Sequence, residues 1–208
     1  MNRSLVYMMS GALWPLVAFP LSHYLTVSPF GSTAFLWFPI LVLPLFLVGI
    51  VGAISYAVAL FVRRKHRMGL FFLLLPFVFC VSVYFGRPLG RMVRRAAFVR
   101  LAERSTPLVT AIRAYESKYG APPPALAKLV PEFLPEVPRT GMRAYSIYRY
   151  YAGPVASKCD GNPWVLEVST PSGGINFDTF IYFPLQNYPK TGHGGYLEPI
   201  RDWAYVHE

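Results

Sequence analysis

The side chains best suited to chemistry in this 208-residue chain are two cysteines, Cys80 and Cys159, and His193, which stands between two glycines. Neither cysteine belongs to a CxxC or a Cys–His arrangement, so we expect plain thiols and no metal or redox site. A catalytic His193 requires an orienting carboxylate, for which Asp202 is a candidate, and a nucleophile. The chain has no Gly-x-Ser-x-Gly element, P-loop, dinucleotide fingerprint or HExxH motif. The sequence therefore predicts a protein that is not an enzyme and has no cofactor; a hydrolase that uses His193 and Asp202 is the alternative.

The run Asp160-Gly161-Asn162-Pro163 places two oxygen-bearing side chains two residues apart. Oxygen ligands at such spacing occur in calcium loops, but this composition is typical of a turn, and no second carboxylate cluster lies nearby. From the residues alone we predict a turn and no metal site.

Arginines dominate residues 87–104, which we predict to form a basic amphipathic helix at the membrane surface. Apolar residues recur along one stripe of this helix, and most arginines lie off that stripe. Such a helix attracts anionic lipid headgroups, although it is also compatible with a solvated connecting helix. The expected headgroup contacts are Arg87, Arg91, Arg94, Arg95 and Arg100. Residues 105–208 carry nine basic and nine acidic residues, so we predict no nucleic-acid partner.

The elements that must position these residues divide at about residue 86. Residues 1–86 contain five Lys or Arg and no acid, and the first acid is Glu103. This distribution excludes one uniform soluble domain, a disordered chain and a disulfide-stapled miniprotein. It predicts a transmembrane region over 1–86, with three helices near 4–25, 34–62 and 68–86. The first of these has a signal peptide as its alternative, but no small-x-small cleavage site follows it.

The charges also predict an orientation. The short loop 63–67 holds four basic residues and the loop 26–33 holds none, so the positive-inside rule places 63–67 in the cytoplasm and the C-terminal domain outside. The arginines after residue 86 then lie on the side that the rule disfavours, and we give the short loop more weight. No acid lies within a predicted span, which argues against transporters, proton pumps and intramembrane hydrolases.

Residues 105–208 predict a small α+β domain. A helix is expected to start at Ser105-Thr106-Pro107 and to stop at Gly120, followed by a helical turn over 125–130. Period-two patterns then predict strands over 145–151, 164–169, 177–183 and 203–208. The expected fold is one main helix and an antiparallel sheet of three to four strands.

The stretch AIRAYESKYGAPPPALAKLVPEFLPEVP resembles the segment after the long helix of type IV pilin-like proteins, especially the type II secretion pseudopilins. The match is carried by Tyr115, Gly120, Pro123, Leu126, Leu129, Leu134, Pro135 and Pro138. The resemblance implies a pseudopilin-like domain and a calcium loop of the kind that would include Asp160. Pilin-like proteins have a single N-terminal helix with a glutamate near its start, whereas Leu74 stands at that position here and two apolar segments precede it. The expectation is therefore a pseudopilin-like domain on a multi-helix anchor.

Together these features predict a non-enzymatic multi-pass protein of the inner (plasma) membrane whose C-terminal domain is extracytoplasmic. Its expected partners are the lipid bilayer and a membrane or envelope protein. The alternative is a subunit of a transport or secretion complex.

Overall fold

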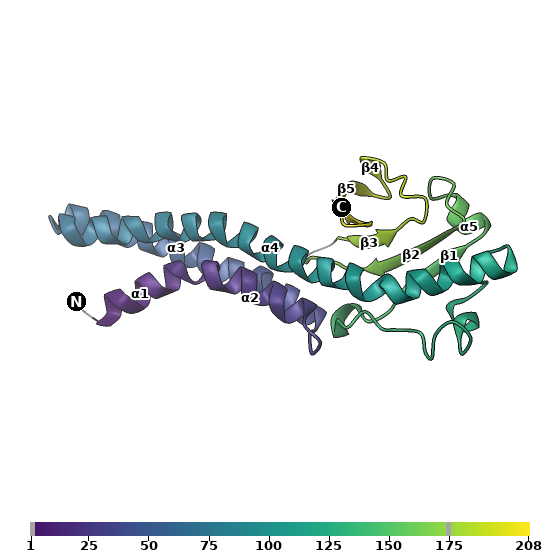
Figure 1. Cartoon of the computed structure of the whole chain (residues 1–208). Coiled ribbons are helices and arrows are strands. Elements are labelled where there is room, and N and C mark those ends of the chain that lie inside the picture. Colours follow the sequence, from purple (N-terminus) through teal and green to yellow (C-terminus); the bar gives the residue numbers. More distant parts are fainter. Residues whose placement is uncertain (1–2, 174–175) are drawn as a thin grey trace. The chain divides into compact units, whose positions relative to one another are not determined.

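The computed structural model describes residues 3–173 and 176–208, and the chain divides into two compact units (Figure 1). The helical unit comprises the residues up to Thr26 together with Ala34–Arg94. The α+β unit comprises Val27–Thr33 and Arg95–Glu208. Residues Val27–Thr33, which connect two helices of the helical unit, therefore belong to the α+β unit.

The helical unit contains α1 (Arg3–Leu13), α2 (Pro15–Val27, whose last residue belongs to the α+β unit), the 3-10 helix η1 (Thr33–Leu36), α3 (Phe38–Val62) and the first part of α4 (His66–Tyr119). The single helix expected over 4–25 is broken at Trp14. Pro15 lacks the N–H needed to continue α1 and disfavours helical geometry at the residue before it. Instead Pro15 occupies the first position of α2, where a missing N–H costs nothing.

Two helices, not the three expected, are long and apolar enough to cross a membrane in the part of the chain that the structure describes. They are Pro44–Val62 within α3 and an apolar window within α4. Only 11% of the first window and 17% of the second is buried, whereas a core helix of a soluble protein would be mostly covered. By contrast α1 and α2 have 11 and 13 residues, or about 16 and 20 Å of helix.

Helix α4 runs for 54 residues without interruption, so residues 87–104 are not a separate helix and Ser105 is not a helix start. The Ser105 hydroxyl instead donates to the Leu101 carbonyl, one turn back in the same helix. Pro107 lies within the helix. The residues on either side of it, including Leu101 and Leu108, are buried, so packing holds the helix together across the proline.

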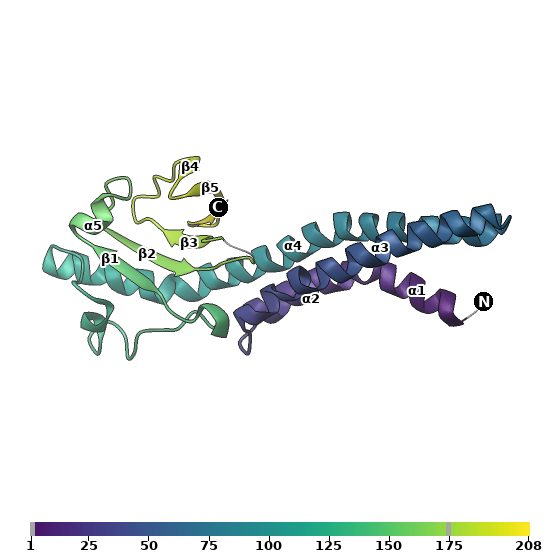
Figure 2. The same cartoon turned by 180° about the vertical axis from the view of Figure 1, so that it is seen from behind.

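The α+β unit places the last turns of α4 against a six-stranded antiparallel sheet with the strand order β1-β2-β3-β6-β5-β4 (Figure 2). Three to four strands were expected. The strands are β1 (Arg149–Ala152), β2 (Trp164–Ser169), β3 (Thr179–Tyr182), β4 (Thr191–Gly192), β5 (Gly195–Ile200) and β6 (Trp203–His207). The short helices are η2 (Leu126–Leu129), η3 (Arg143–Tyr145) and α5 (Pro154–Ser157). Strands β4 and β5 are the two that the period-two patterns did not predict.

Side chains alternate between two buried clusters, one on each face of the sheet. Trp164, Leu166 and Val168 of β2 belong to the cluster that includes Phe98 and Ile112 of α4. Val165, between them in the strand, belongs to the second cluster with residues of β3, β5, β6 and α5. The predicted alternation along 164–168 is thus confirmed, and the central strands are covered on both faces.

Candidate functional site

Helix α2 packs tightly on α4 at two glycines spaced four residues apart. A Cβ atom added to Gly86 would lie 2.5 Å from the carbonyl oxygen of Pro15, and one added to Gly90 would lie 2.4 Å from Cδ2 of His23. Phe19 fills the space between, with contacts to both glycine positions. Small residues at this spacing let two helix backbones approach closely, and they are enriched at the interfaces between membrane helices. The pairs Pro15–Gly86 and His23–Gly90 advance together, so α2 runs parallel to this part of α4.

Helices α3 and α4 form an antiparallel hairpin closed by the turn at 63–65. The ring of Phe46 stacks on that of Phe79 with centroids 4.5 Å apart, and Tyr56 meets Phe72 edge-on at 4.8 Å. The residue number in α3 rises as that in α4 falls, as an antiparallel pair requires. Both α2 and the first part of α4 therefore run opposite to α3.

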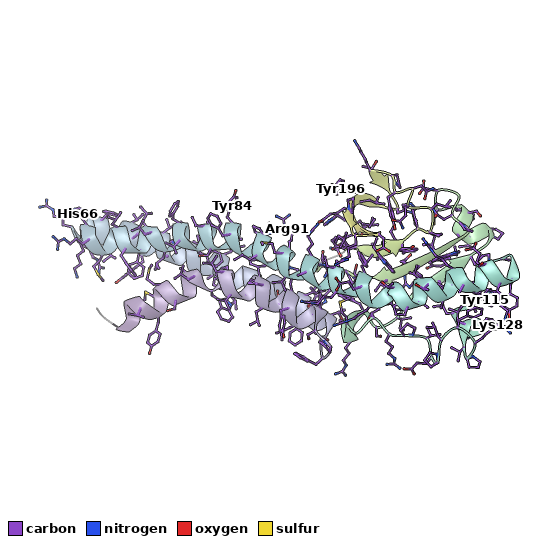
Figure 3. The ribbon with its side chains drawn as sticks, in the orientation of Figure 1. His66, Tyr84, Arg91, Tyr115, Lys128 and Tyr196 are labelled. Carbon is purple, nitrogen blue, oxygen red and sulfur yellow. The ribbon has the colours of Figure 1, made fainter. Side chains whose placement is uncertain are left out.

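Two exposed arginines of the helical unit, Arg87 and Arg91, follow the apolar part of α4. Tyr84, Arg87 and Arg91 lie at i, i+3 and i+7, which places them on one face of the helix. Tyr84 is 73% exposed, and it projects from α4 on the same side as Arg91 (Figure 3). Neither Arg87 nor Arg91 forms an ion pair with another described residue. A tyrosine followed by unpaired cations is typical of a helix that leaves the bilayer.

The remaining predicted headgroup contacts differ from one another. Arg94 is buried. The Arg95 Nε donates to Glu198 over 2.8 Å, and the other carboxylate oxygen of Glu198 lies 2.8 Å from His207 Nε2. Burial opposes ionisation of Glu198, but the hydrogen bonds from His207 and Arg95 outweigh it and hold the pKa of Glu198 below its usual value. Arg100 is exposed and, like Arg87 and Arg91, has no ion-pair partner among the described residues.

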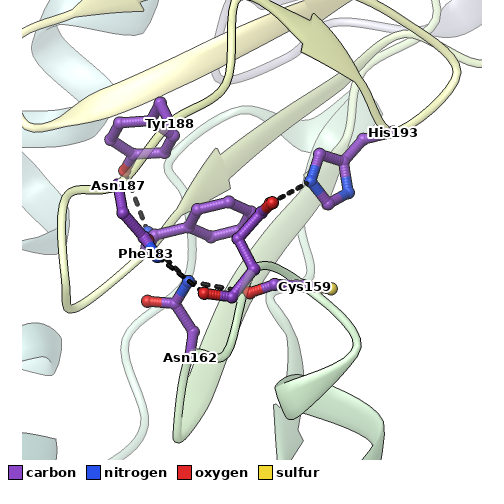
Figure 4. Close-up of polar contacts among 7 residues, drawn as sticks. Cys159, Asn162, Phe183, Asn187, Tyr188 and His193 are labelled. Atoms are coloured by element: carbon purple, nitrogen blue, oxygen red, sulfur yellow. Dashed lines mark hydrogen bonds and ion pairs between the residues drawn. The ribbon is translucent and has the colours of Figure 1, made fainter.

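A network of loop side chains surrounds His193 at one end of the sheet (Figure 4). Nε2 of His193 lies 2.9 Å from a carboxylate oxygen of Asp160. The Asn187 amide donates to the Asp160 backbone carbonyl, and the Asn162 amide donates to the side-chain oxygen of Asn187. These bonds join the turn at 159–162 both to Asn187, in the loop before β4, and to His193, in the turn between β4 and β5. The network therefore holds three irregular segments together.

The network uses the groups that a calcium site would need. The side-chain oxygen of Asn162 accepts from the Leu185 N–H, and the Asp160 carboxylate is paired with His193. No group of three or more His, Cys, Asp and Glu side chains that could hold a metal ion occurs within residues 3–173 and 176–208. The turn expected at 160–163 is present, with Asp160 at φ +54°.

The carboxylate beside His193 is Asp160, not the Asp202 that the hydrolase alternative requires. The backbone carbonyl of Asp202 accepts bonds from Gln186 and Tyr188. Cys159 is adjacent to Asp160 in the chain, but burial, together with the negative charge of Asp160, raises the pKa of its thiol. The thiol is therefore a poor nucleophile near neutral pH.

Two polar ties hold the α+β unit together. The Ser105 hydroxyl is 2.8 Å from the Tyr148 hydroxyl, which joins α4 to the segment before β1. Asp178 is buried and accepts bonds from the Tyr205 hydroxyl (2.6 Å) and the Glu208 N–H (2.9 Å). Asp178 thereby fixes the C-terminal strand.

Sequence reasoning missed the glycine pair and the partner of His193. Gly86-Arg-Pro-Leu-Gly90 is a G-x-x-x-G motif beside an apolar helix, so the sequence carries a signal for the helix contact. His193 and Asp160 are 33 positions apart and both lie in irregular segments, so no periodic pattern in the sequence predicts their contact.

Comparison of the chain with protein-family models, with curated proteins and with solved structures finds no match.

Proposed function

We propose that this chain is a non-enzymatic, multi-pass protein of the inner (plasma) membrane that presents its α+β unit outside the cytoplasm as an interaction module. The observation that carries the proposal is the direction of the helices in the helical unit. Because α2 runs parallel to α4 and α3 runs opposite to both, three crossings put residues 28–32 and the start of the α+β unit on the same side of a bilayer. The turn at 63–65 then lies on the other side.

The distribution of basic residues indicates which end of the helical unit faces the cytoplasm. Residues 63–67 contain four of the five basic residues that precede Arg87, and residues 28–32 contain none. In short loops the positive-inside rule acts most strongly, so the 63–67 turn is cytoplasmic in our proposal. The arginines that follow residue 86 lie outside the cytoplasm in this topology, against the rule. Two of them are engaged within the protein: Arg94 is buried, and Arg95 binds Glu198.

The broken first segment is the third crossing in this proposal. Helices α1 and α2 together cover residues 3–27, about 37 Å of helix, which suffices even with a bend at Trp14. The hydroxyls of Ser22 and Thr26 donate to carbonyls of their own helix, so they need no water.

The interaction role rests on the α+β unit. In this proposal the unit acts as pseudopilin-like domains do, by binding other proteins, as the resemblance in the sequence implies. Residues 1–86 contain no acid, and the pair of His193 and Asp160 in the α+β unit serves to join loops. A subunit of a transport or secretion complex is the alternative; stoichiometric co-purification with a membrane transport machinery would favour it.

The proposal is tested by reporter fusions. Alkaline phosphatase, which is active only outside the cytoplasm, is fused after Glu208, and a fluorescent protein that folds only in the cytoplasm is fused there in parallel. We expect phosphatase activity and no fluorescence at Glu208, and the reverse for sandwich fusions within residues 63–67. Fluorescence at Glu208 would refute the three-crossing topology.

A further inference from the structure

The segment 137–148, here called the interfacial loop, carries exposed cations beside an exposed apolar side chain. Arg139 and Arg143 are exposed and form no ion pair with another described residue. Ile147 is 73% exposed and, with Arg139 and Tyr148, lines a shallow depression of about 250 Å³. The loop itself contains no acid; the nearest in the sequence is Glu136.

Despite its irregular shape the interfacial loop is pinned. The Thr140 hydroxyl donates to the Tyr145 carbonyl over 2.7 Å and accepts from the Met142 N–H over 3.1 Å. Gly141 has φ +75°, and a Cβ there would lie 2.5 Å from the Arg104 guanidinium, so α4 presses directly on the loop. Met142 and Tyr145 are both buried. Ile147 is thus displayed by a fixed backbone.

The same buried core also holds the connection between α2 and α3. Val27 belongs to the cluster that contains Met142 and Tyr145, and residues Val27–Thr33 belong to the α+β unit. Within this connection Phe30 is 60% exposed. If α2 and α3 cross the membrane, as the proposed function requires, a connection this short lies at the bilayer surface. The core that carries the interfacial loop is then held beside that surface.

We infer that the interfacial loop binds the anionic phospholipid headgroups of the bilayer in which the chain is anchored, with Arg139 and Arg143 on phosphate and Ile147 in the headgroup–acyl boundary. Guanidinium groups suit phosphate because their N–H donors match two oxygens at once. An apolar side chain beside them adds burial in the boundary layer, as in other interfacial anchors. This inference rests on the proposed function, because it needs the anchor to bring the bilayer to the loop.

The test uses spin labels on the full chain in nanodiscs. In a background with Cys80→Ser and Cys159→Ser, a nitroxide is attached in turn at Ile147→Cys, at Val155→Cys and at Val51→Cys. Val155 is also exposed and apolar but lies on α5, and Val51 is an exposed residue of α3. Collision with oxygen reports lipid, and collision with a nickel chelate reports water. The discs contain phosphatidylcholine alone or with phosphatidylglycerol.

In discs with phosphatidylglycerol we expect the label at Ile147 to be shielded from nickel, while that at Val155 collides freely. The double variant Arg139→Gln, Arg143→Gln should reduce the bound fraction, with about a five-fold loss of binding per arginine. Free nickel access at Ile147, or shielding that is equal in neutral discs and survives the double variant, overturns the inference. The label at Val51 separates the two proposals: nickel access there refutes the membrane anchor itself, whereas lipid exposure at Val51 with water at Ile147 refutes only the headgroup contact.

Discussion

Replacing Gly86 by alanine places a methyl group 2.5 Å from the Pro15 carbonyl oxygen. Ordinary van der Waals contact begins near 3.4 Å, so the two helices must separate by about 0.9 Å or α2 must distort. Overpacking of this kind costs about 1–3 kcal/mol. Alanine gains about 0.8–1 kcal/mol over glycine in helix propensity, so we expect a net loss of up to about 2 kcal/mol in the unfolding free energy of the helical unit.

The chain supplies matched controls for this substitution. Gly49 and Gly52 lie in α3, and a Cβ atom added to either would have no neighbour within 4 Å. Gly49→Ala and Gly52→Ala should therefore be neutral or stabilising by about 1 kcal/mol. At Gly90 the closest atom belongs to the His23 ring, so His23→Ala should recover most of the loss caused by Gly90→Ala. No side-chain truncation relieves Gly86→Ala, because the obstacle there is backbone.

The assay is reversible unfolding by sodium dodecyl sulfate in mixed micelles, followed by circular dichroism. The free energies of Gly86→Ala, Gly90→Ala, His23→Ala and the double variant at 23 and 90 form a mutant cycle whose coupling term isolates the contact. Equal stability of Gly86→Ala and Gly49→Ala would refute the parallel packing of α2 on α4, and with it the argument for the side of the membrane.

Three further predictions concern the α+β unit. Burial raises the pKa of the Cys159 thiol, so in a Cys80→Ser background its alkylation by iodoacetamide should be slow at neutral pH. The alkylation rate should continue to increase above the pH at which the rate for a free peptide thiol becomes constant. A rate for Cys159 that becomes constant at that same pH would contradict this. Glu198 has a folded-state pKa below its unfolded value, so its contribution to stability is complete above the unfolded pKa and is lost as the pH falls through the folded pKa. Glu198→Gln should therefore reduce the fall in melting temperature at acid pH. An unchanged fall would refute the stabilising role of ionised Glu198. Tyr205→Phe removes one of the bonds to buried Asp178 and should cost about 1–3 kcal/mol in thermal unfolding, whereas a loss near zero would mean that water replaces the hydroxyl.

Much of the α+β fold is readable from local patterns. The alternation along 164–169 matches β2 residue for residue, and the helix ends at Tyr119 with Gly120 directly after it, as predicted. The predicted turn over 125–130 contains η2. These elements depend on short-range periodicity and on residues that stop helices, both of which are visible in one sequence.

Strand β5 was missed because its local signals point elsewhere. It contains Pro199, which lacks an N–H for pairing, and it begins at the last of the glycines in residues 192–195. Its pairing with β6, in which Pro199 is opposite Ala204, is set by the chain reversal at 201–202 and by burial of Leu197 and Ile200. Tertiary packing of this kind cannot be predicted from a short stretch of sequence.

Two predictions made at prolines were wrong in opposite directions. Pro15 breaks a segment predicted as one helix, whereas Pro107 lies inside a helix predicted to begin there. Near Pro107, Ser105 and Leu108 are buried, and the Ser105 hydroxyl bonds to that of Tyr148, so tertiary contacts hold α4 together at this point. Pro15 instead takes the first position of a new helix, where its missing N–H costs nothing. Contacts between residues 43 positions apart, such as that of Ser105 with Tyr148, cannot be read from the residues around a proline.

The place of Val27 in the buried core has a consequence for how the protein can be taken apart. A fragment that begins at Arg95 would lack Val27, and it would have a cavity in its core where the Val27 side chain packs. Cutting the chain instead within residues 63–65 leaves Val27 on one piece and the other buried residues of its cluster on the second, while α2 and α3 on the first piece keep their contacts to offer to α4 on the second. Two such pieces, synthesised separately in one cell, should find each other and assemble, so the protein is better split between its helices than between its units.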